Sequence, residues 1–152
     1  YMRLSRNGYY RVTKEGGRFQ IGIPSIFRAG TDIEVFPTGY MTGLAMQAAE
    51  ELEGKISVKV INVSTIKPMN KEAIIEMAQG CKAIVTAEEH SVIGGLGSAV
   101  AEVMKQECEP IEFVGINDTF GCSAHCYQDV LAYHGLTKEH IIEAVKRMND
   151  LR

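Results

Sequence analysis

The chain has 152 residues, of which 45% are hydrophobic and 23% charged, and its formal net charge is -3. This length fits one domain with a hydrophobic core of its own, and the composition is typical of globular domains. The small acidic excess gives no reason to expect nucleic acid or an anionic membrane as a partner, no apolar run approaches the roughly 18 residues of a membrane-spanning helix, and no signal peptide is visible.

The amino-terminal stretch resembles a connecting segment more than a part of the core. Residues 1–6 are aromatic and basic and alternate partly, as at the end of a strand whose sheet lies elsewhere. Residues 9–17 are polar and contain glycine, which indicates a linker. Residues 19–23 and 25–28 are short extended pieces, and Pro24 restricts them to a sheet edge or a strand start. Because the chain does not begin with Met, we expect a processed product or a fragment of a longer protein.

From residue 32 onward, short apolar or β-branched runs alternate with amphipathic stretches. The runs predict strands, and the amphipathic stretches, bounded by polar caps and glycines, predict helices. The predicted strands are 32–37, 56–63, 83–87 and 111–116, and the predicted helices are 41–53, 70–79, one from about 97, 127–133 and one after residue 137. Asn70 and Thr137 are the expected N-caps of two helices. This alternation predicts an α/β fold with a mostly parallel sheet and helices on both faces.

The densest group of ionisable side chains follows the strand predicted at residues 83–87. Glu88, Glu89 and His90 stand at its carboxyl end, where ligand sites lie in open α/β sheets. Two carboxylates beside a histidine can perform acid–base chemistry, but such groups more often hold loops or subunits together. We therefore predict a candidate interface or ligand-binding turn here and no catalytic residue.

A glycine-rich turn comes next and leads into a helix. Gly94, Gly95 and Gly97, followed by Ser98, let the backbone turn sharply and approach another segment closely. Their spacing is not that of the dinucleotide-binding fingerprint, and the acidic residue that closes such a unit is not evident. We therefore favour chain geometry and close packing over phosphate binding, and what the turn binds stays open.

The cysteines indicate free thiols in a reducing cytoplasm, because a domain of this size with a good core does not need disulfides. They are Cys81, Cys108, Cys122 and Cys126. Cys122, His125 and Cys126 form a small cluster, with His134 further along. The CxxHC spacing is not a familiar zinc motif and a second ligand pair is missing, so we predict no metal site.

Several segments together resemble the C-terminal region of transketolase. They are Tyr1-Met2-Arg3-Leu4-Ser5-Arg6, Thr38-Gly39-Tyr40-Met41, Val60-Ile61-Asn62-Val63-Ser64-Thr65-Ile66-Lys67-Pro68, Ile84-Val85-Thr86-Ala87-Glu88-Glu89-His90-Ser91, Gly94-Gly95-Leu96-Gly97-Ser98, Asp118-Thr119-Phe120-Gly121 and His134-Gly135-Leu136-Thr137. The match covers nearly the whole chain and is most similar to the separate C-terminal subunit of split bacterial and archaeal transketolases. The C-terminal domains of 1-deoxyxylulose-5-phosphate synthase and of the β-subunits of 2-oxo acid dehydrogenases rank second and third.

The resemblance implies a three-layer α/β/α sandwich with a five-stranded mixed sheet, whose first strand, at residues 25–28, is antiparallel to the rest. It divides the chain into residues 1–17, the tail of a preceding pyrimidine-binding domain plus linker, and residues 18–152, the C-terminal domain. It implies a thiamine-diphosphate enzyme that transfers a two-carbon ketol unit between sugar phosphates. The cofactor and its divalent metal would bind outside this chain, which lacks a Gly-Asp-Gly segment with a following asparagine. The domain itself would be structural, forming a homodimer together with an N-terminal thiamine-binding partner, and inactive alone.

One site residue follows from the resemblance. Transketolases hold the substrate phosphate with an arginine in a Leu-Ser-Arg segment, and Leu4-Ser5-Arg6 matches that segment, so Arg6 is a candidate phosphate ligand. The sequence departs from the family at Ala124, which replaces a usual glycine and puts the local turn in doubt. A non-enzymatic α/β interaction or ligand-sensing module is the alternative from another functional class.

Overall fold

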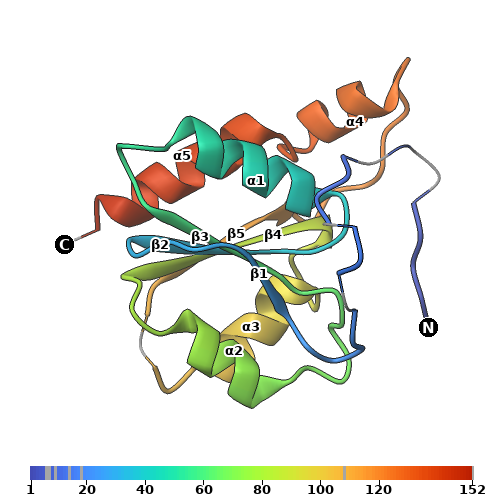
Figure 1. Ribbon diagram of the computed structural model, residues 1–152. Helices are drawn as coiled ribbons and strands as arrows, with labels where there is room; N and C mark the ends of the chain where they lie inside the picture. The colour runs from blue at the N-terminus through green and yellow to red at the C-terminus, as the bar shows by residue number, and fades with distance from the viewer. Residues whose placement is uncertain (6–7, 9, 14, 18, 108, 152) are drawn as a thin grey trace.

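The computed structural model describes residues 1–5, 8, 10–13, 15–17, 19–107 and 109–151. Five strands form one mixed sheet in the order β1-β3-β2-β4-β5, and helices cover both of its faces (Figure 1). The strands are β1 (Ser25–Arg28), β2 (Ile33–Pro37), β3 (Val58–Asn62), β4 (Ala83–Ser91) and β5 (Ile111–Ile116). Strand β1 is antiparallel to β3, whereas the other neighbouring pairs are parallel. The predicted five-stranded sandwich with one antiparallel edge strand is therefore confirmed.

The helices form two layers that enclose separate apolar clusters. They are α1 (Met41–Glu51), α2 (Lys71–Ala78), α3 (Leu96–Met104), α4 (Tyr127–Tyr133) and α5 (Lys138–Asn149). Helices α1, α4 and α5 lie on one side of the sheet, and α2 and α3 on the other (Figure 1). Strand β2 serves both clusters, because Val35 packs toward α1 and α5 while the next residue, Phe36, packs toward α2 and α3. None of the helices in the described ranges has the length and apolar character needed to cross a membrane.

Local signals in the sequence mark some of the helix ends. The Asn70 side chain accepts a hydrogen bond from the Ala73 amide at 3.0 Å, so the predicted cap of α2 is confirmed. Thr137 does stand at the N-cap position of α5, but its side chain makes no capping bond; the hydroxyl lies 2.9 Å from His140 Nδ1 instead. Helix α1 ends at Glu51, and Gly54 takes a φ of 76° in the turn that follows.

Two expected extended segments differ from the structure. Residues 19–23 form a turn, closed by a 3.2 Å hydrogen bond from the Ile23 amide to the Gln20 carbonyl, because Gly22 adopts a φ of 86° that an extended strand cannot have. Strand β4 continues to Ser91, four residues beyond the predicted end, because it keeps β5 as a neighbour across an irregular register between Ala87 and Ser91. The acidic residues thus belong to the last part of a strand and not to a loop.

Candidate functional site

The buried carboxylate of Glu88 organises the turn after β4. Only 1% of Glu88 is exposed, and its two oxygens accept hydrogen bonds from the first amides of α3, Oε2 from Leu96 at 2.6 Å and Oε1 from Gly97 at 2.8 Å. A helix start offers unpaired amides and a partial positive charge, so a carboxylate is stabilised there. Glu88 therefore acts as an internal cap, and these two amides are already bound within the domain.

The glycines around Glu88 are required by space. A Cβ at Gly95 would overlap the Glu88 carboxylate and the Ser91 carbonyl, and a Cβ at Gly97 would lie 2.8 Å from Thr86 Oγ1 and 2.9 Å from the Phe113 ring. Each of these distances is too short for a side chain at that position. Packing thus accounts for Gly95 and Gly97, which are both buried.

The outer part of the turn is exposed and held by a serine. Ser98 Oγ accepts a hydrogen bond from the Gly94 amide at 2.9 Å and donates one to the Val92 carbonyl at 2.8 Å. Gly94 has a φ of 75°, in the left-handed region that favours glycine. Gly94, together with Ile93, of which 66% is exposed, forms the surface that a partner could contact.

Glu89 and His90 point to different environments. The Arg3 guanidinium donates to the Glu89 carbonyl at 2.8 Å and lies 3.5 Å from the Glu89 carboxylate, so the amino-terminal segment contacts the tip of β4. His90 is exposed. The three residues of the predicted cluster therefore do not share one site, and their role at an interface or in ligand binding stays a prediction. Arg6, the candidate phosphate ligand, lies outside the described residues.

The predicted cysteine–histidine cluster is arranged differently from its sequence order. Cys122 Sγ lies 3.7 Å from Nε2 of His134, which follows α4, whereas His125 and Cys126 are both exposed. In the part of the chain that the structure describes, no three acidic, histidine or cysteine side chains are placed to hold a metal ion.

A buried ionisable group that was not expected from the sequence lies beneath α2. Glu34 is completely buried in the middle of β2, and neither oxygen has a hydrogen-bond partner. Lys59 Nζ lies 3.9 Å away and donates to the carbonyls of Met77 and Gln79 at 2.9 Å, at the end of α2. Burial raises the pKa of Glu34 to about 8, although the nearby Lys59 ammonium acts in the opposite direction. A glutamate inside an otherwise apolar strand was the available signal.

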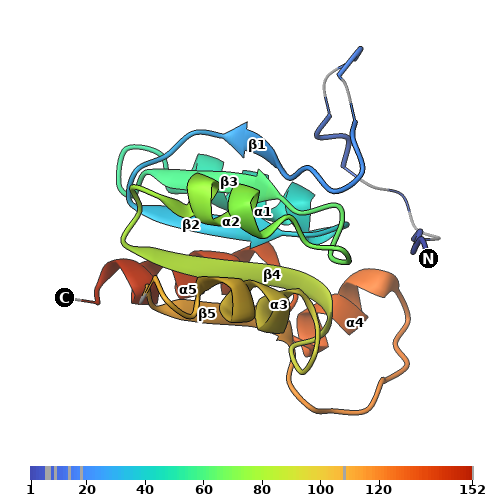
Figure 2. The ribbon, with the colours of Figure 1, turned by 90° about the horizontal axis from the view of Figure 1, so that it is seen from below.

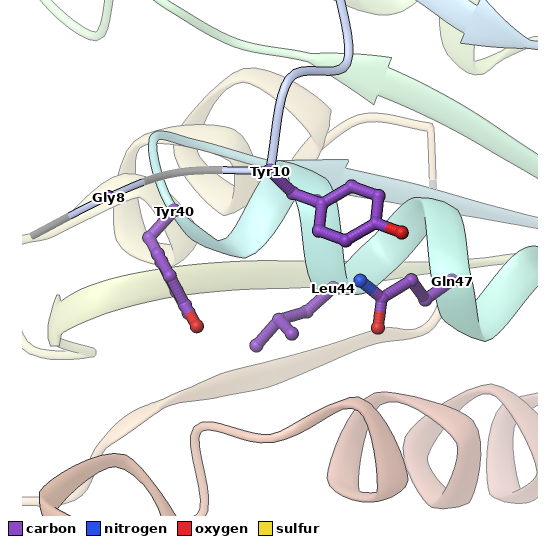
Figure 3. Close-up of a pocket in the computed structure, with 6 residues that line it drawn as sticks. Gly8, Tyr10, Tyr40, Leu44 and Gln47 are labelled. Atoms are coloured by element: carbon purple, nitrogen blue, oxygen red, sulfur yellow. The ribbon is translucent and has the colours of Figure 1, made fainter. Parts of the chain in front are cut away.

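The described part of the amino-terminal segment also packs on α1. Tyr10 lies over Gly43, and a shallow cavity of about 270 Å³ is lined by Gly8, Tyr10, Tyr40, Gly43, Leu44 and Gln47 (Figure 3). The Tyr40 ring meets the Tyr127 ring edge to face, with centroids 5.4 Å apart. The turn that follows β4, with Glu88 at its base, does not line this cavity.

Comparison with known protein families assigns this chain to one of them. Residues 25–141 match the family model described as the C-terminal domain of transketolase. The chain belongs to the transketolase C-terminal domain family. Within this domain, the matched range begins at the first residue of β1 and ends inside α5.

Individual relatives of the transketolase C-terminal domain include subunits of divided enzymes. The chain is 40% identical to the 6-deoxy-6-sulfo-D-fructose transketolase subunit SqwH of Clostridium sp. (strain MSTE9), over 99% of its own length and 47% of that protein. It is 36% identical to the putative transketolase C-terminal section of Methanocaldococcus jannaschii, over 95% of its own length and 46% of that protein. The chain thus spans about half the length of these curated relatives.

Solved structures agree with this assignment. A split-gene transketolase, described as an inactive beta4 tetramer, superposes with a TM-score of 0.88 at 39% identity, over 96% of this chain and 48% of that one. Transketolase from Leishmania mexicana gives a TM-score of 0.61 at 17% identity, which shows the common fold. Both the sequence and the fold of this chain therefore match the transketolase C-terminal domain family.

Proposed function

We propose that this chain is the C-terminal part of a thiamine-diphosphate-dependent transketolase that transfers a two-carbon ketol unit between sugar phosphates. The observation that carries the proposal is the nearly complete match of this chain to about half of a protein named as a transketolase subunit. The match to a split-gene transketolase of known structure supports the same function. In this proposal residues 1–17 belong to the preceding domain and its linker, and residues 18–152 form the C-terminal domain, within which the family match spans residues 25–141.

The cofactor would be bound outside this chain. Its diphosphate and divalent metal need unoccupied phosphate-binding amides and acidic metal ligands. The amides of Leu96 and Gly97 support this proposal, because they already bind Glu88 and are not open to a diphosphate. This chain would then contribute assembly and a substrate contact to the complete enzyme.

The purified chain should neither bind thiamine diphosphate specifically nor transfer ketol groups. Titration calorimetry with the cofactor and Mg²⁺ measures the first property, and a coupled assay with sugar phosphates measures the second. Adding the thiamine-binding region encoded in the same genome should restore transfer. Specific micromolar cofactor binding by the chain alone would contradict the proposal, as would a reconstituted complex without activity.

Arg6→Ala should lower kcat/KM for phosphorylated sugars in the reconstituted enzyme by about 10- to 150-fold. A guanidinium binds two phosphate oxygens at once through two hydrogen bonds. Such a charge-assisted contact contributes roughly 1.5–3 kcal/mol, and each 1.4 kcal/mol corresponds to a factor of about ten in kcat/KM. Unphosphorylated acceptors should lose much less, because they never used the contact.

Arg11→Ala is the matched control for Arg6, because Arg11 is an exposed arginine of the same segment, 3.7 Å from the Glu15 carboxylate. It should change neither substrate class. An equal loss for both classes in Arg6→Ala would assign Arg6 to folding or assembly, and no loss would leave it a surface residue.

We further propose that the chain self-associates, as a homodimer in a cytoplasmic enzyme. The exposed Ile93 and Gly94 at the tip of the turn give a contact surface on which backbones can approach closely. Light scattering over a range of protein concentrations should show a dimer, and weakening by Ile93→Glu would place the contact. A monomer at every concentration would refute it.

A second candidate is the C-terminal domain of 1-deoxy-D-xylulose-5-phosphate synthase. The chain is 35% identical to that enzyme from Heliobacterium modesticaldum, over 86% of this chain and 20% of the enzyme. A chain of this type would belong to a much longer protein. Formation of 1-deoxy-D-xylulose 5-phosphate by the reconstituted enzyme, without ketol transfer between sugar phosphates, would favour this reading.

A further inference from the structure

The loop between β5 and α4 brings a thiol to an imidazole. Residues 117–126 leave the sheet as an open loop at the edge of the molecule (Figure 2). Its half-buried Cys122 lies with Sγ 3.7 Å from Nε2 of His134, a hydrogen-bond distance for sulfur. The Tyr133 ring meets the His134 ring edge to face, with centroids 5.0 Å apart. The imidazole is thus placed against the thiol from the far end of a short helix.

Such a pair has a defined chemical capacity. The thiolate and not the thiol is the nucleophile, and an adjacent imidazole can accept the proton that the thiol releases. In the His134 tautomer with an unprotonated Nε2, this nitrogen accepts a hydrogen bond from the S–H group, whereas in the other tautomer Nε2–H donates to the sulfur. Neither the proposed ketol transfer nor the cap formed by Glu88 uses these two side chains.

The other described cysteines lack this arrangement. Cys126 is exposed, and among the described residues its sulfur makes no hydrogen bond with an imidazole, unlike that of Cys122. Cys81 lies beside the buried Glu34, and burial together with that carboxyl group raises the pKa of the Cys81 thiol to about 11. Cys126 is therefore an accessible thiol without a base, and Cys81 a thiol that stays protonated at neutral pH.

We propose that Cys122 is a modification site, which forms mixed disulfides with small soluble disulfides, and that His134 assists as the base. The Cys122 sulfur attacks one sulfur of the disulfide after its proton passes to His134 Nε2. The new S–S bond forms as the old one breaks, and the departing thiolate leaves with the electron pair and takes the proton from His134. The small disulfide is the oxidant, and one small thiol is released for each protein modified.

Oxidised glutathione is the probe for this site. The folded chain is incubated with it near neutral pH, quenched with acid at intervals, and digested, so that mass spectrometry gives a separate rate for each cysteine. We expect Cys122 to react about tenfold faster than Cys126, and Cys81 to react most slowly. Equal or slower modification of Cys122 relative to Cys126 would overturn the proposal.

His134→Gln tests the role of the base. It should lower the Cys122 rate to that of Cys126 and leave the Cys126 rate unchanged, with circular dichroism checking the fold. A His134→Gln chain that keeps the full Cys122 rate would refute base assistance. If that variant does not fold, the ratio of the Cys122 rate to the Cys126 rate in the unaltered chain decides, because, of the described cysteines, only Cys122 lies against an imidazole.

Discussion

Glu88→Ala should destabilise the domain by about 3–5 kcal/mol, because it removes two charge-assisted hydrogen bonds and leaves buried donors without partners. The lost acceptors are those of the Leu96 and Gly97 amides at the start of α3. A domain of this kind has roughly 5–15 kcal/mol of stability in total, so a large fraction would be lost. Urea unfolding followed by circular dichroism measures the change.

Glu89→Ala is the matched control for Glu88. Its carboxylate lies 3.5 Å from the Arg3 guanidinium, which is more than half exposed, and a surface pair of this kind contributes at most about 1 kcal/mol. Glu88→Gln should fall between the two alanine variants, since an amide keeps one acceptor but turns an N–H group toward a backbone donor. If Glu88→Ala costs no more than Glu89→Ala, the internal cap does not stabilise the fold.

Glu34→Gln should make the stability of the domain less dependent on pH. Glu34 has a folded-state pKa of about 8, against an ordinary value of 4.5, chiefly because burial disfavours its ionised form. The native state therefore holds a proton that the unfolded chain has released, and stability from this group is complete below pH 4.5 and is lost as pH rises to 8. Each pH unit in that interval removes up to about 1.4 kcal/mol.

The measurement is the free energy of unfolding of both chains between about pH 5 and pH 9. The two should be similar near pH 5, and Glu34→Gln should be several kcal/mol more stable near pH 9, since a neutral amide cannot ionise. Glu102→Gln, on an exposed position of α3, controls for the altered net charge. Parallel pH curves for wild type and Glu34→Gln would show that Lys59 compensates the buried charge.

Periodicity and local chemistry predict most of this fold. The runs of β-branched residues predict β2, β3 and β5, and the amphipathic stretches predict the helices between them, because these patterns depend only on which face of an element is buried. Asn70 is a local signal too, since its own side chain caps its helix. The antiparallel direction of β1 could be predicted only from family resemblance, because the four residues Ser25–Arg28 carry no signal of direction.

The candidate site was harder to predict because its contacts join residues that are brought together only when the chain folds. The sequence places Glu88 beside Glu89 and His90, but alternation along β4 and the return of α3 bury Glu88 alone. In the same way, Cys122 is close to His125 in sequence and bonds His134 in space. Glu34 was missed because a single glutamate in a strand pattern is usually solvent-exposed.

The antiparallel edge strand has a practical consequence for attaching probes. Because β1 runs antiparallel to β3, the segment before β1 lies at the end of the sheet where the parallel strands finish. Arg3 contacts Glu89 there. The last helix finishes at the opposite edge, so the two ends of the chain are far apart (Figures 1 and 2). A fluorophore or affinity tag placed after α5 would leave the strand tips unobstructed, whereas joining the two ends into a circular permutant would need a long linker that crosses the whole molecule.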